Sequence, residues 1–319
     1  MEELEDTGFV WPLPACGLRV RKDRVVINED EAAGEESSAP GLVLSQDRQR
    51  EWLSLACTAR ASELVLKRVI GPKPGSWLDV IDRIYEKEKA SVWTRSYLRA
   101  AAEHLSFWSD RIAPHAIVPG PANRILLRPY LLLGRAALES AAHALWVLAA
   151  PQSTDEWVTR FVQLMVGDFK LHRKALVAGG LDTARIDERI RAHNARIDGM
   201  SSLKPPGMPR YLDLVRHAAT ATESDENRWA YLWNAAAGAG HGQNWFGVEG
   251  YILLDKAEYE PGHYRTVSVP NPSFVTETIG AACAALHAGT ARWLAAGKHD
   301  PQMLLDATIE AHDRLQSKE

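Results

Sequence analysis

Four polar side chains interrupt an otherwise apolar stretch of the chain, residues 124–150. They are Arg128, Arg135, Glu139 and His143. At about 100° per residue, an α-helix places all four within an arc of roughly 80°. The residues around them are mostly leucine and alanine, so this helix should be buried, and a buried charge without a partner costs several kcal/mol. The four groups must therefore pair with one another or with a neighbouring helix.

The spacing within this stripe permits two roles. Glu139 lies four positions from both Arg135 and His143, and side chains four apart are neighbours on a helix surface. In one interpretation the groups form a buried ion network that orients helices. In the other they form an acid–base or anion-binding site, in which Glu139 adjusts the pKa of His143. Arg135, Glu139 and His143 are then catalytic candidates, and Arg128 binds the ligand.

A second set of polar residues recurs every seven positions in the stretch 226–242. It consists of Asn227, Asn234 and His241, which share one helix face. His241 lies among three glycines, whose missing side chains let a ligand or another backbone approach closely. We expect either an interhelical hydrogen bond with a histidine at the helix end, or a site in which His241 is catalytic. The ligand-binding candidates on this helix are Tyr231, Trp233 and Asn234.

A metal site is an alternative for the same part of the chain. Asp168 and His172, again four apart, join Glu139, His143 and His241 to supply three imidazoles and two carboxylates. Bundle metal sites use such groups from facing helices. Di-iron bundles, however, carry Glu-x-x-His, whereas both pairs here are spaced by four. No metal ligand is therefore assigned and no cofactor is expected. Signatures of phosphate-binding loops, α/β-hydrolases, zinc proteases and kinases are absent from the sequence.

The elements that must position these residues are mostly helices. Apolar periodicity and capping residues predict helices over 46–69, 76–89, 91–112, 122–150, 154–177, 183–200, 209–221, 224–240, 273–296 and 300–316. Residues that favour strands predict a small β-hairpin near 250–270, and residues 18–27 suit a short second one. We expect a mostly α protein, a multi-helix bundle with a small hairpin.

Charge divides the chain into a tail and a body. Residues 1–40 hold ten acidic and four basic side chains, so of the net charge of −4 they carry −6 and the rest carries +2. We expect an acidic, partly flexible tail over 1–45 and a single helical domain over 46–319. The nearly neutral body lacks the strong basic surface of a duplex-DNA-binding protein, although a local RNA site remains compatible with it.

Cysteines and hydropathy indicate the compartment. The three cysteines lie far apart, with no CxxC pair, so neither a zinc ribbon nor a disulfide framework is predicted. No apolar run approaches the roughly 18 residues of a membrane span, and the N-terminus lacks a signal pattern. We expect no membrane partner and a cytoplasmic protein. The frequent alanine and arginine hint at a bacterial source.

Two short motifs carry a resemblance. At Arg135-x3-Glu139 and Tyr231-x9-His241-Gly242 the chain resembles, over residues 120–295, a loose group of uncharacterised helical proteins from bacteria, often actinobacteria. That group tends to carry a serine before the histidine, where this sequence has alanine and glycine.

The spacing of Arg210 and His217 is similar to that of helical nucleases of the HEPN group, which use an arginine and a downstream histidine at a dimer interface. The polar residue usual after that arginine is Tyr211 here. A distant HEPN relation implies RNA cleavage or nucleotide binding without a metal.

Our principal expectation is instead a helical binding or interaction protein, a homo-oligomer and most simply a homodimer. It would have a polar site for a small anionic ligand or RNA. A HEPN-like nuclease and a bundle metalloprotein are the alternatives.

Overall fold

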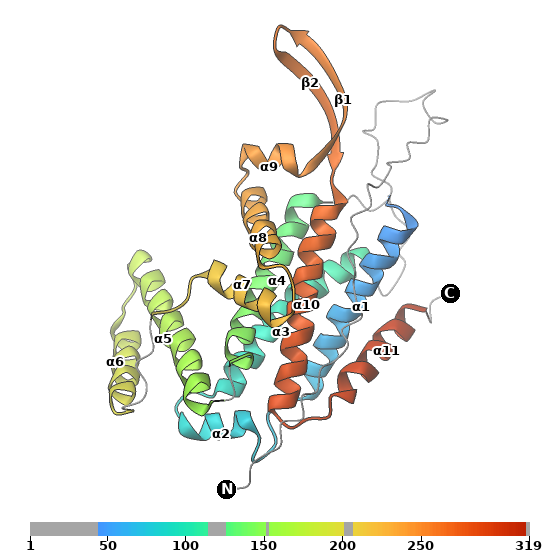
Figure 1. Cartoon of the computed structure of the whole chain (residues 1–319). Coiled ribbons are helices and arrows are strands. Elements are labelled where there is room, and N and C mark those ends of the chain that lie inside the picture. The colour runs from blue at the N-terminus through green and yellow to red at the C-terminus, as the bar shows by residue number, and fades with distance from the viewer. Residues whose placement is uncertain (1–43, 114–125, 151–152, 201–206, 317–319) are drawn as a thin grey trace. The chain divides into compact units, whose positions relative to one another are not determined.

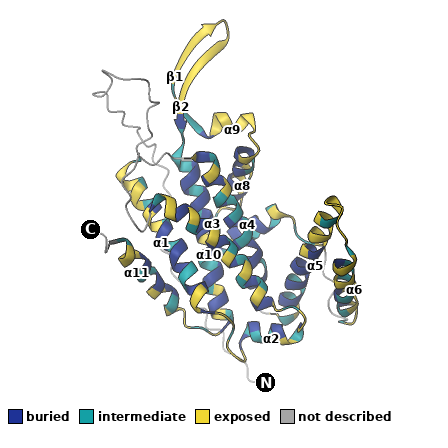
Figure 2. Ribbon diagram, turned by 180° about the vertical axis from the view of Figure 1, so that it is seen from behind, coloured by how far each residue is buried: buried dark blue, intermediate teal, exposed yellow. Residues whose placement is uncertain are grey.

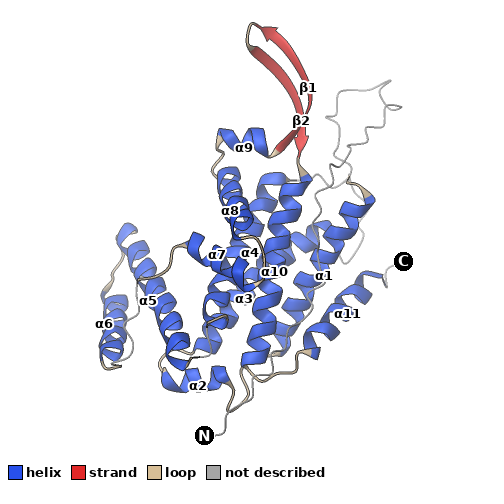
Figure 3. Cartoon of the chain, in the orientation of Figure 1, coloured by secondary structure: helices blue, strands red, loops and turns tan. Residues whose placement is uncertain are grey.

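The computed structural model describes residues 44–113, 126–150, 153–200 and 207–316 (Figure 1). Helices dominate these residues, and the strands among them form one antiparallel two-stranded sheet (Figure 3). The predicted mostly α fold with a small hairpin near 250–270 is confirmed. The second hairpin suggested for residues 18–27 lies outside the described residues. Residues 41–319 group into one compact unit.

The elements follow the predicted order, with one short helix added before the hairpin. They are α1 (Gln46–Arg68), α2 (Trp77–Ile84), α3 (Ala90–Ile112), α4 (Leu127–Leu148), α5 (Thr154–Ala178), α6 (Ala184–Asp198), α7 (Tyr211–Ala221), α8 (Glu226–Gly240), α9 (Asn244–Glu249), β1 (Tyr251–Glu260), β2 (His263–Pro270), α10 (Pro272–Ala296) and α11 (Gln302–Gln316).

Helix α4 lies at the centre of the bundle. It packs against α3, α5, α7, α8 and α10, and Figure 2 shows buried residues concentrated on α3, α4 and α10. Among the helices described, α4 alone is long and apolar enough to cross a membrane, but 61% of its apolar window is buried inside the structure. It is therefore the core helix of the bundle, and its apolar surface is covered by other helices.

Close contact between α4 and α10 depends on a glycine. A Cβ at Gly134 of α4 would lie 2.9 Å from a methyl carbon of Thr278 and 3.2 Å from Cδ1 of Ile279, both on α10. These side chains are buried, so they have no free space into which to move. Gly134 thus sets how closely the two central helices approach.

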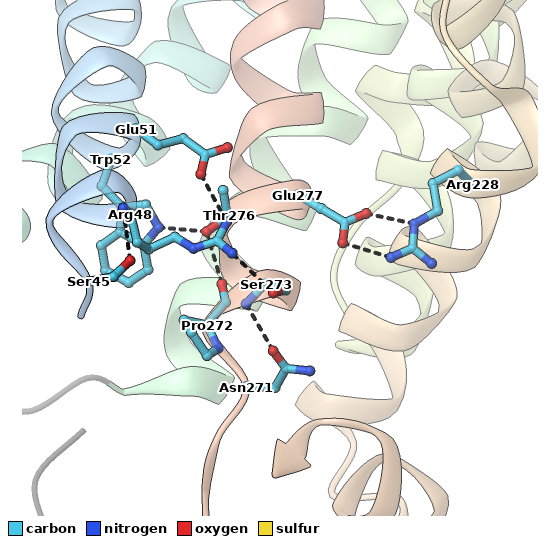
Figure 4. Close-up of polar contacts among 10 residues, drawn as sticks. All are labelled: Ser45, Arg48, Glu51, Trp52, Arg228, Asn271, Pro272, Ser273, Thr276 and Glu277. Atoms are coloured by element: carbon cyan, nitrogen blue, oxygen red, sulfur yellow. Dashed lines mark hydrogen bonds and ion pairs between the residues drawn. The ribbon is translucent and has the colours of Figure 1, made fainter. Parts of the chain in front are cut away.

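Polar contacts fix the first turns of α10 on two sides (Figure 4). Arg228 of α8 binds Glu277 through two hydrogen bonds of 2.7 and 2.8 Å. On the other side, Trp52 of α1 donates its indole N–H to Thr276 at 2.7 Å. The side chain of Asn271 caps the helix by accepting from the backbone N–H of Ser273. Helices α1, α8 and α10 are therefore tied together at one end of the bundle.

The start of α3 differs from the prediction. The sequence pattern predicted that this helix begins at residue 91, but it begins at Ala90, where Lys89 occupies the cap position and makes no side-chain cap bond. The carboxylate of Asp82 in α2 instead accepts hydrogen bonds from the backbone N–H of Ser91, at 3.0 Å, and from its hydroxyl. A cap supplied from another helix leaves no local signal, which is why the sequence pattern placed the helix start one residue late.

Helices α5 and α6 form a hairpin that is anchored to the α2 end of the bundle. Tyr85 contacts Nδ1 of His193 through its hydroxyl at 2.5 Å, and Arg196 donates to the backbone oxygen of Ile84 at 3.0 Å. Most of α6 is exposed, but His193 is buried, and this burial lowers the pKa of His193. This anchor holds α5 in position beside α4.

Alanine at Gly134 and at Gly280 should have opposite effects. Both glycines are in helices, so alanine brings each a propensity gain of up to about 1 kcal/mol. A Cβ at Gly280 of α10 meets nothing within 4 Å, so Gly280→Ala should raise stability. Gly134→Ala must displace Thr278 and should lower the free energy of unfolding by about 1–3 kcal/mol. Urea denaturation of the two variants measures both; equal effects would show that the α4–α10 contact is not tight.

Candidate functional site

The charged stripe of α4 pairs partly within itself and partly with α8. The Nε atom of Arg135 lies 2.8 Å from Oε1 of Glu139. Trp233 of α8 donates its indole N–H to the same oxygen at 2.7 Å, and its ring lies 4.6 Å from the guanidinium carbon of Arg135. The side chains of Arg135 and Glu139 are 22% and 21% exposed. The three groups form a closed network that joins the two helices.

The other two members of the stripe bind backbone oxygens. Arg128 donates to the carbonyl of Ala239 at 2.6 Å, near the C-terminus of α8, where positive charge is favourable. Nδ1 of His143 forms a hydrogen bond of 2.7 Å with the backbone oxygen of Glu139, not with the carboxylate of that residue. Burial lowers the pKa of His143 more than Glu139 and Asp168 raise it. The imidazole is therefore neutral at pH 7, and the expected pairing with the Glu139 carboxylate is not formed.

His143 lines a cleft of about 240 Å³ between α3, α4, α5 and the start of α7. These helices can be located in Figure 1. The lining residues are Tyr97, His104, Ala136, Glu139, Ser140, His143, Asp168, Leu171, Met208 and Tyr211.

Three aromatic rings stack together in this cleft. The ring of Tyr97 lies over that of His143, with centroids 5.0 Å apart and planes at 29°. Tyr211 meets the same imidazole edge-on at 5.3 Å. Burial raises the pKa of Tyr97 and of Tyr211, and the nearby Asp168 raises both further. The phenols are therefore protonated, so neither carries a negative charge.

Asp168 is a carboxylate without a direct partner. Among the residues the structure describes, none donates a hydrogen bond to it or pairs with it as an ion within 4.0 Å. Although its side chain is exposed to solvent, partial desolvation raises its pKa more than His172, His143 and Arg189 lower it. The charged form of Asp168 is thus less favoured than that of a free aspartate.

The structure does not bring His241 to this cleft. Trp233 contacts Glu139 and Ala239 contacts Arg128, so α8 runs antiparallel to α4 and ends near Arg128. That point is eleven residues, or about 16 Å along the helix, from Glu139. His241 is exposed and caps the C-terminus of α8 through its backbone N–H. The catalytic candidates therefore divide into Glu139 and His143 at the cleft, Arg135 beside it, and His241 elsewhere.

Two of the three ligand-binding candidates on α8 have partners outside the cleft, whereas Trp233 donates to Glu139, which lines it. Asn234 donates to the backbone oxygen of Ala230 in its own helix at 2.8 Å, so the expected interhelical hydrogen bond is replaced by a local one. Tyr231 donates to Glu249 at 3.4 Å. The glycines before His241 accommodate side chains of this chain, since Gly238 lies against the ring of Trp245.

The Arg210 and His217 pair is split between two environments. Arg210 is exposed and binds Asp213 through contacts of 2.9 and 3.2 Å. His217 is partly buried, and its Nε2 accepts a hydrogen bond from Nη1 of Arg160 at 3.2 Å. Burial, aided by the charge of Arg160, lowers the pKa of His217 to about 4. His217 is therefore a neutral hydrogen-bond acceptor that helps to hold α5 against α7.

The metal alternative finds no ligand set in the described ranges. No three histidine, cysteine, aspartate or glutamate side chains in these parts of the chain lie close enough to hold a metal ion. Of the five residues considered from the sequence, Glu139, His143 and Asp168 line the cleft. His172 contributes to the electrostatics of Asp168, and His241 lies at the end of α8.

Several cleft residues were not identified as site residues from the sequence. Tyr97 and His104 lie seven positions apart on α3, a spacing that places them on one helix face. Tyr211 and Met208 lie around the start of α7. The i, i+7 spacing of Tyr97 and His104 was a usable signal, but the sequence does not indicate which face of α3 meets α4 and α5.

Comparison with known proteins adds no further information. No protein-family model matches the chain, and no curated protein or solved structure matches it.

Removal of the Glu139 carboxylate should be costly. Glu139→Ala leaves the Trp233 N–H and the Arg135 charge without their acceptor in a partly buried position, so the free energy of unfolding should fall by about 2–3 kcal/mol. Glu156 is a matched control, because it pairs with Arg160 at the same 2.8 Å and the same spacing but is 42% exposed. Glu156→Ala should cost less than about 1 kcal/mol. Chemical denaturation measures both, and similar losses would contradict a network centred on Glu139.

His217 should make the fold sensitive to acid. Its pKa falls from 6.5 to about 4 on folding, so the unfolded chain binds the proton more tightly. The contribution of His217 to the free energy of unfolding is complete above pH 6.5 and is lost as the pH drops toward 4. Between pH 7.5 and 5.0 the free energy of unfolding should fall by about 2 kcal/mol. His217→Gln should reduce the pH dependence of urea denaturation by that amount. His263→Gln, at an exposed histidine, is the control and should behave as the wild type.

Proposed function

We propose that the protein binds a small cationic ligand in the cleft between α3, α4, α5 and α7. One observation carries this proposal. The cleft combines three aromatic rings with two carboxylates, and the described residues that line it include no lysine or arginine. Aromatic faces and carboxylates together favour an organic cation, such as an alkylamine or a quaternary ammonium group.

Asp168 is the expected anchor for the positive charge. Its carboxylate has no ion-pair partner among the described residues, and its raised pKa reflects a charge that the surrounding cleft does not neutralise. A bound cation provides the missing partner. Glu139 also lines the cleft, and both of its side-chain hydrogen bonds with described residues, including the one from Arg135, fall on Oε1.

The aromatic rings suit the apolar part of such a ligand. Tyr97 and His143 stack, and Tyr211 meets His143 edge-on. All three residues line the cleft, so the lining offers aromatic carbon atoms to a methylene or methyl group. Ligand pockets usually enclose about 300–1,000 Å³. A cleft of about 240 Å³ therefore fits a ligand of few non-hydrogen atoms.

An anionic ligand has less support at this site. The arginines expected to bind an anion are engaged elsewhere, Arg128 with the backbone oxygen of Ala239 and Arg135 with Glu139. An anion in the cleft would also face the charge of Asp168. The ligand class inferred from the geometry is thus opposite in sign to the one expected from the sequence.

We further propose that this helical binding protein acts in the cytoplasm. Cys57 and Cys283, the cysteines within the described residues, are buried free thiols, and their pKa values are raised by burial. Unpaired, unreactive thiols are compatible with a reducing compartment.

The proposal is tested by calorimetric titration of the full chain with tetramethylammonium and with n-butylamine at pH 7.5. Asp168→Asn keeps the shape of the side chain and removes its charge, so it should weaken binding at least tenfold. Asp155→Asn, the same change at an exposed position near the start of the same helix, should leave binding unchanged. Binding by the wild type should weaken as the pH is lowered through the raised pKa of Asp168, because protonation removes the anchoring charge.

Titrations with inorganic phosphate, acetate and a short RNA oligonucleotide complete the test. If an anion or RNA binds and Asp168→Asn strengthens that binding, the cationic assignment is wrong. If no probe binds to the wild type, or if Asp168→Asn and Asp155→Asn bind the amines equally, Asp168 does not anchor a cation.

A further inference from the structure

The hairpin of β1 and β2 extends from the bundle, and within the described ranges no third strand pairs with it (Figure 1). Its strands are ten and eight residues long, and α9 contacts it at the base. Figure 2 shows almost all of it as exposed. An isolated two-stranded sheet is marginally stable in water, and three or more strands with an apolar face are needed for independent stability. The hairpin therefore lacks a packing partner within the described part of this chain.

The exposed side chains of the hairpin include large apolar ones. Leu253 is 55% exposed, Tyr259 54% and Val267 46%. Tyr264 and, in the adjoining α9, Trp245 and Val248 are also exposed. Single exposed apolar residues are ordinary, but several on one projecting element mark an interaction surface.

The two edges of the hairpin differ in their capacity to pair with another strand. The register along β1 is interrupted near Leu254 and again near Tyr259, whereas the paired residues of β2 run without a gap from His263 to Pro270. β1 also carries four charged residues, and β2 carries one, Arg265, apart from His263 at its start. Irregular and charged edges resist pairing with further strands. The edge of β2 is the one left open.

We propose that this edge of β2 binds the same edge of a second copy of the chain, so that two hairpins form one four-stranded antiparallel sheet. With Thr266 on the two-fold axis, Arg265 lies opposite Val267 of the second copy, and Tyr264 lies opposite Ser268. No two like charges face each other across the new pairing. A closed two-fold contact of this kind yields a dimer and leaves no growing edge except the two protected β1 strands.

Charge complementarity supports a second copy as the occupant. Within one hairpin, Asp255 is opposite Val267. Because Val267 faces Arg265 of the second copy, one row on one face of the sheet contains Asp255, Val267 and that arginine. Among the described residues Asp255 forms no ion pair, and Arg265 lies 5.5 Å from the centre of the Tyr259 ring. Pairing of two copies thus places each Asp255 carboxylate, which among the described residues accepts only the backbone N–H of Lys256, in the same row as a guanidinium group.

This dimer surface is independent of the ligand cleft, because the cleft is formed by α3, α4, α5 and α7 whereas the hairpin adjoins α9. Sedimentation velocity of the full chain over a range of concentrations is expected to show a dimer. Val267→Lys puts a positive charge opposite Arg265 of the second copy and should weaken dimerisation at least tenfold. Leu253→Lys is the matched control, an equally exposed apolar residue on β1, and should leave the dimer intact.

A cross-link tests the register. In a Cys16→Ser background, Thr266→Cys should give a disulfide-linked dimer under mild oxidation, whereas Ala257→Cys on β1 should not. Circular dichroism confirms that each variant retains its helices, since the hairpin lies outside the helical core. A wild-type monomer at all concentrations would overturn the proposal. So would a dimer that Val267→Lys leaves unchanged, or that Leu253→Lys disrupts equally.

Discussion

The structure depends on how the charge of Glu139 is accommodated in α4, the central helix of the bundle. A carboxylate in the middle of α4 is tolerated because Arg135 and Trp233 both donate to one of its oxygens. The indole comes from α8, so the pairing of one charge also sets the position of a second helix. Breaking such a pair leaves an uncompensated charge, which costs far more than the intact pair contributes. This constraint specifies the packing of α8 on α4 more than it stabilises either helix.

Glu139 also connects the core to the cleft. Its carboxylate satisfies Trp233 of α8, and the same residue lines the cleft together with His143 and Asp168. The position of α8 and the charge presented to a ligand therefore depend on one side chain. A substitution that changes the ligand preference at Glu139 must also change helix packing, whereas Asp168, which has no such structural role, is free to serve binding alone.

Most helices and the hairpin were predictable because their signals are local. Apolar periodicity, the Asp225 cap of α8 and the Pro261-Gly262 turn all act within a few residues. The cap that Asp82 supplies to α3 and the short α9 were not predictable in this way. The candidate site was predicted in part. Glu139 and His143 stood out as polar residues in an apolar helix, but the rings that complete the cleft come from helices far apart in sequence.

Asp168 and the edge of β2 have one property in common. In the described part of the chain, Asp168 is a partly desolvated carboxylate without an ion-pair partner, and β2 is a regular strand edge with few protecting charges. Each leaves polar groups without the protein partner that such groups ordinarily have when they are withdrawn from water. Local violations of this rule concentrate at functional positions, where a partner molecule completes what the chain leaves open. A cation at Asp168 and a second strand at β2 each supply the missing interaction, and neither requires the helical core to move.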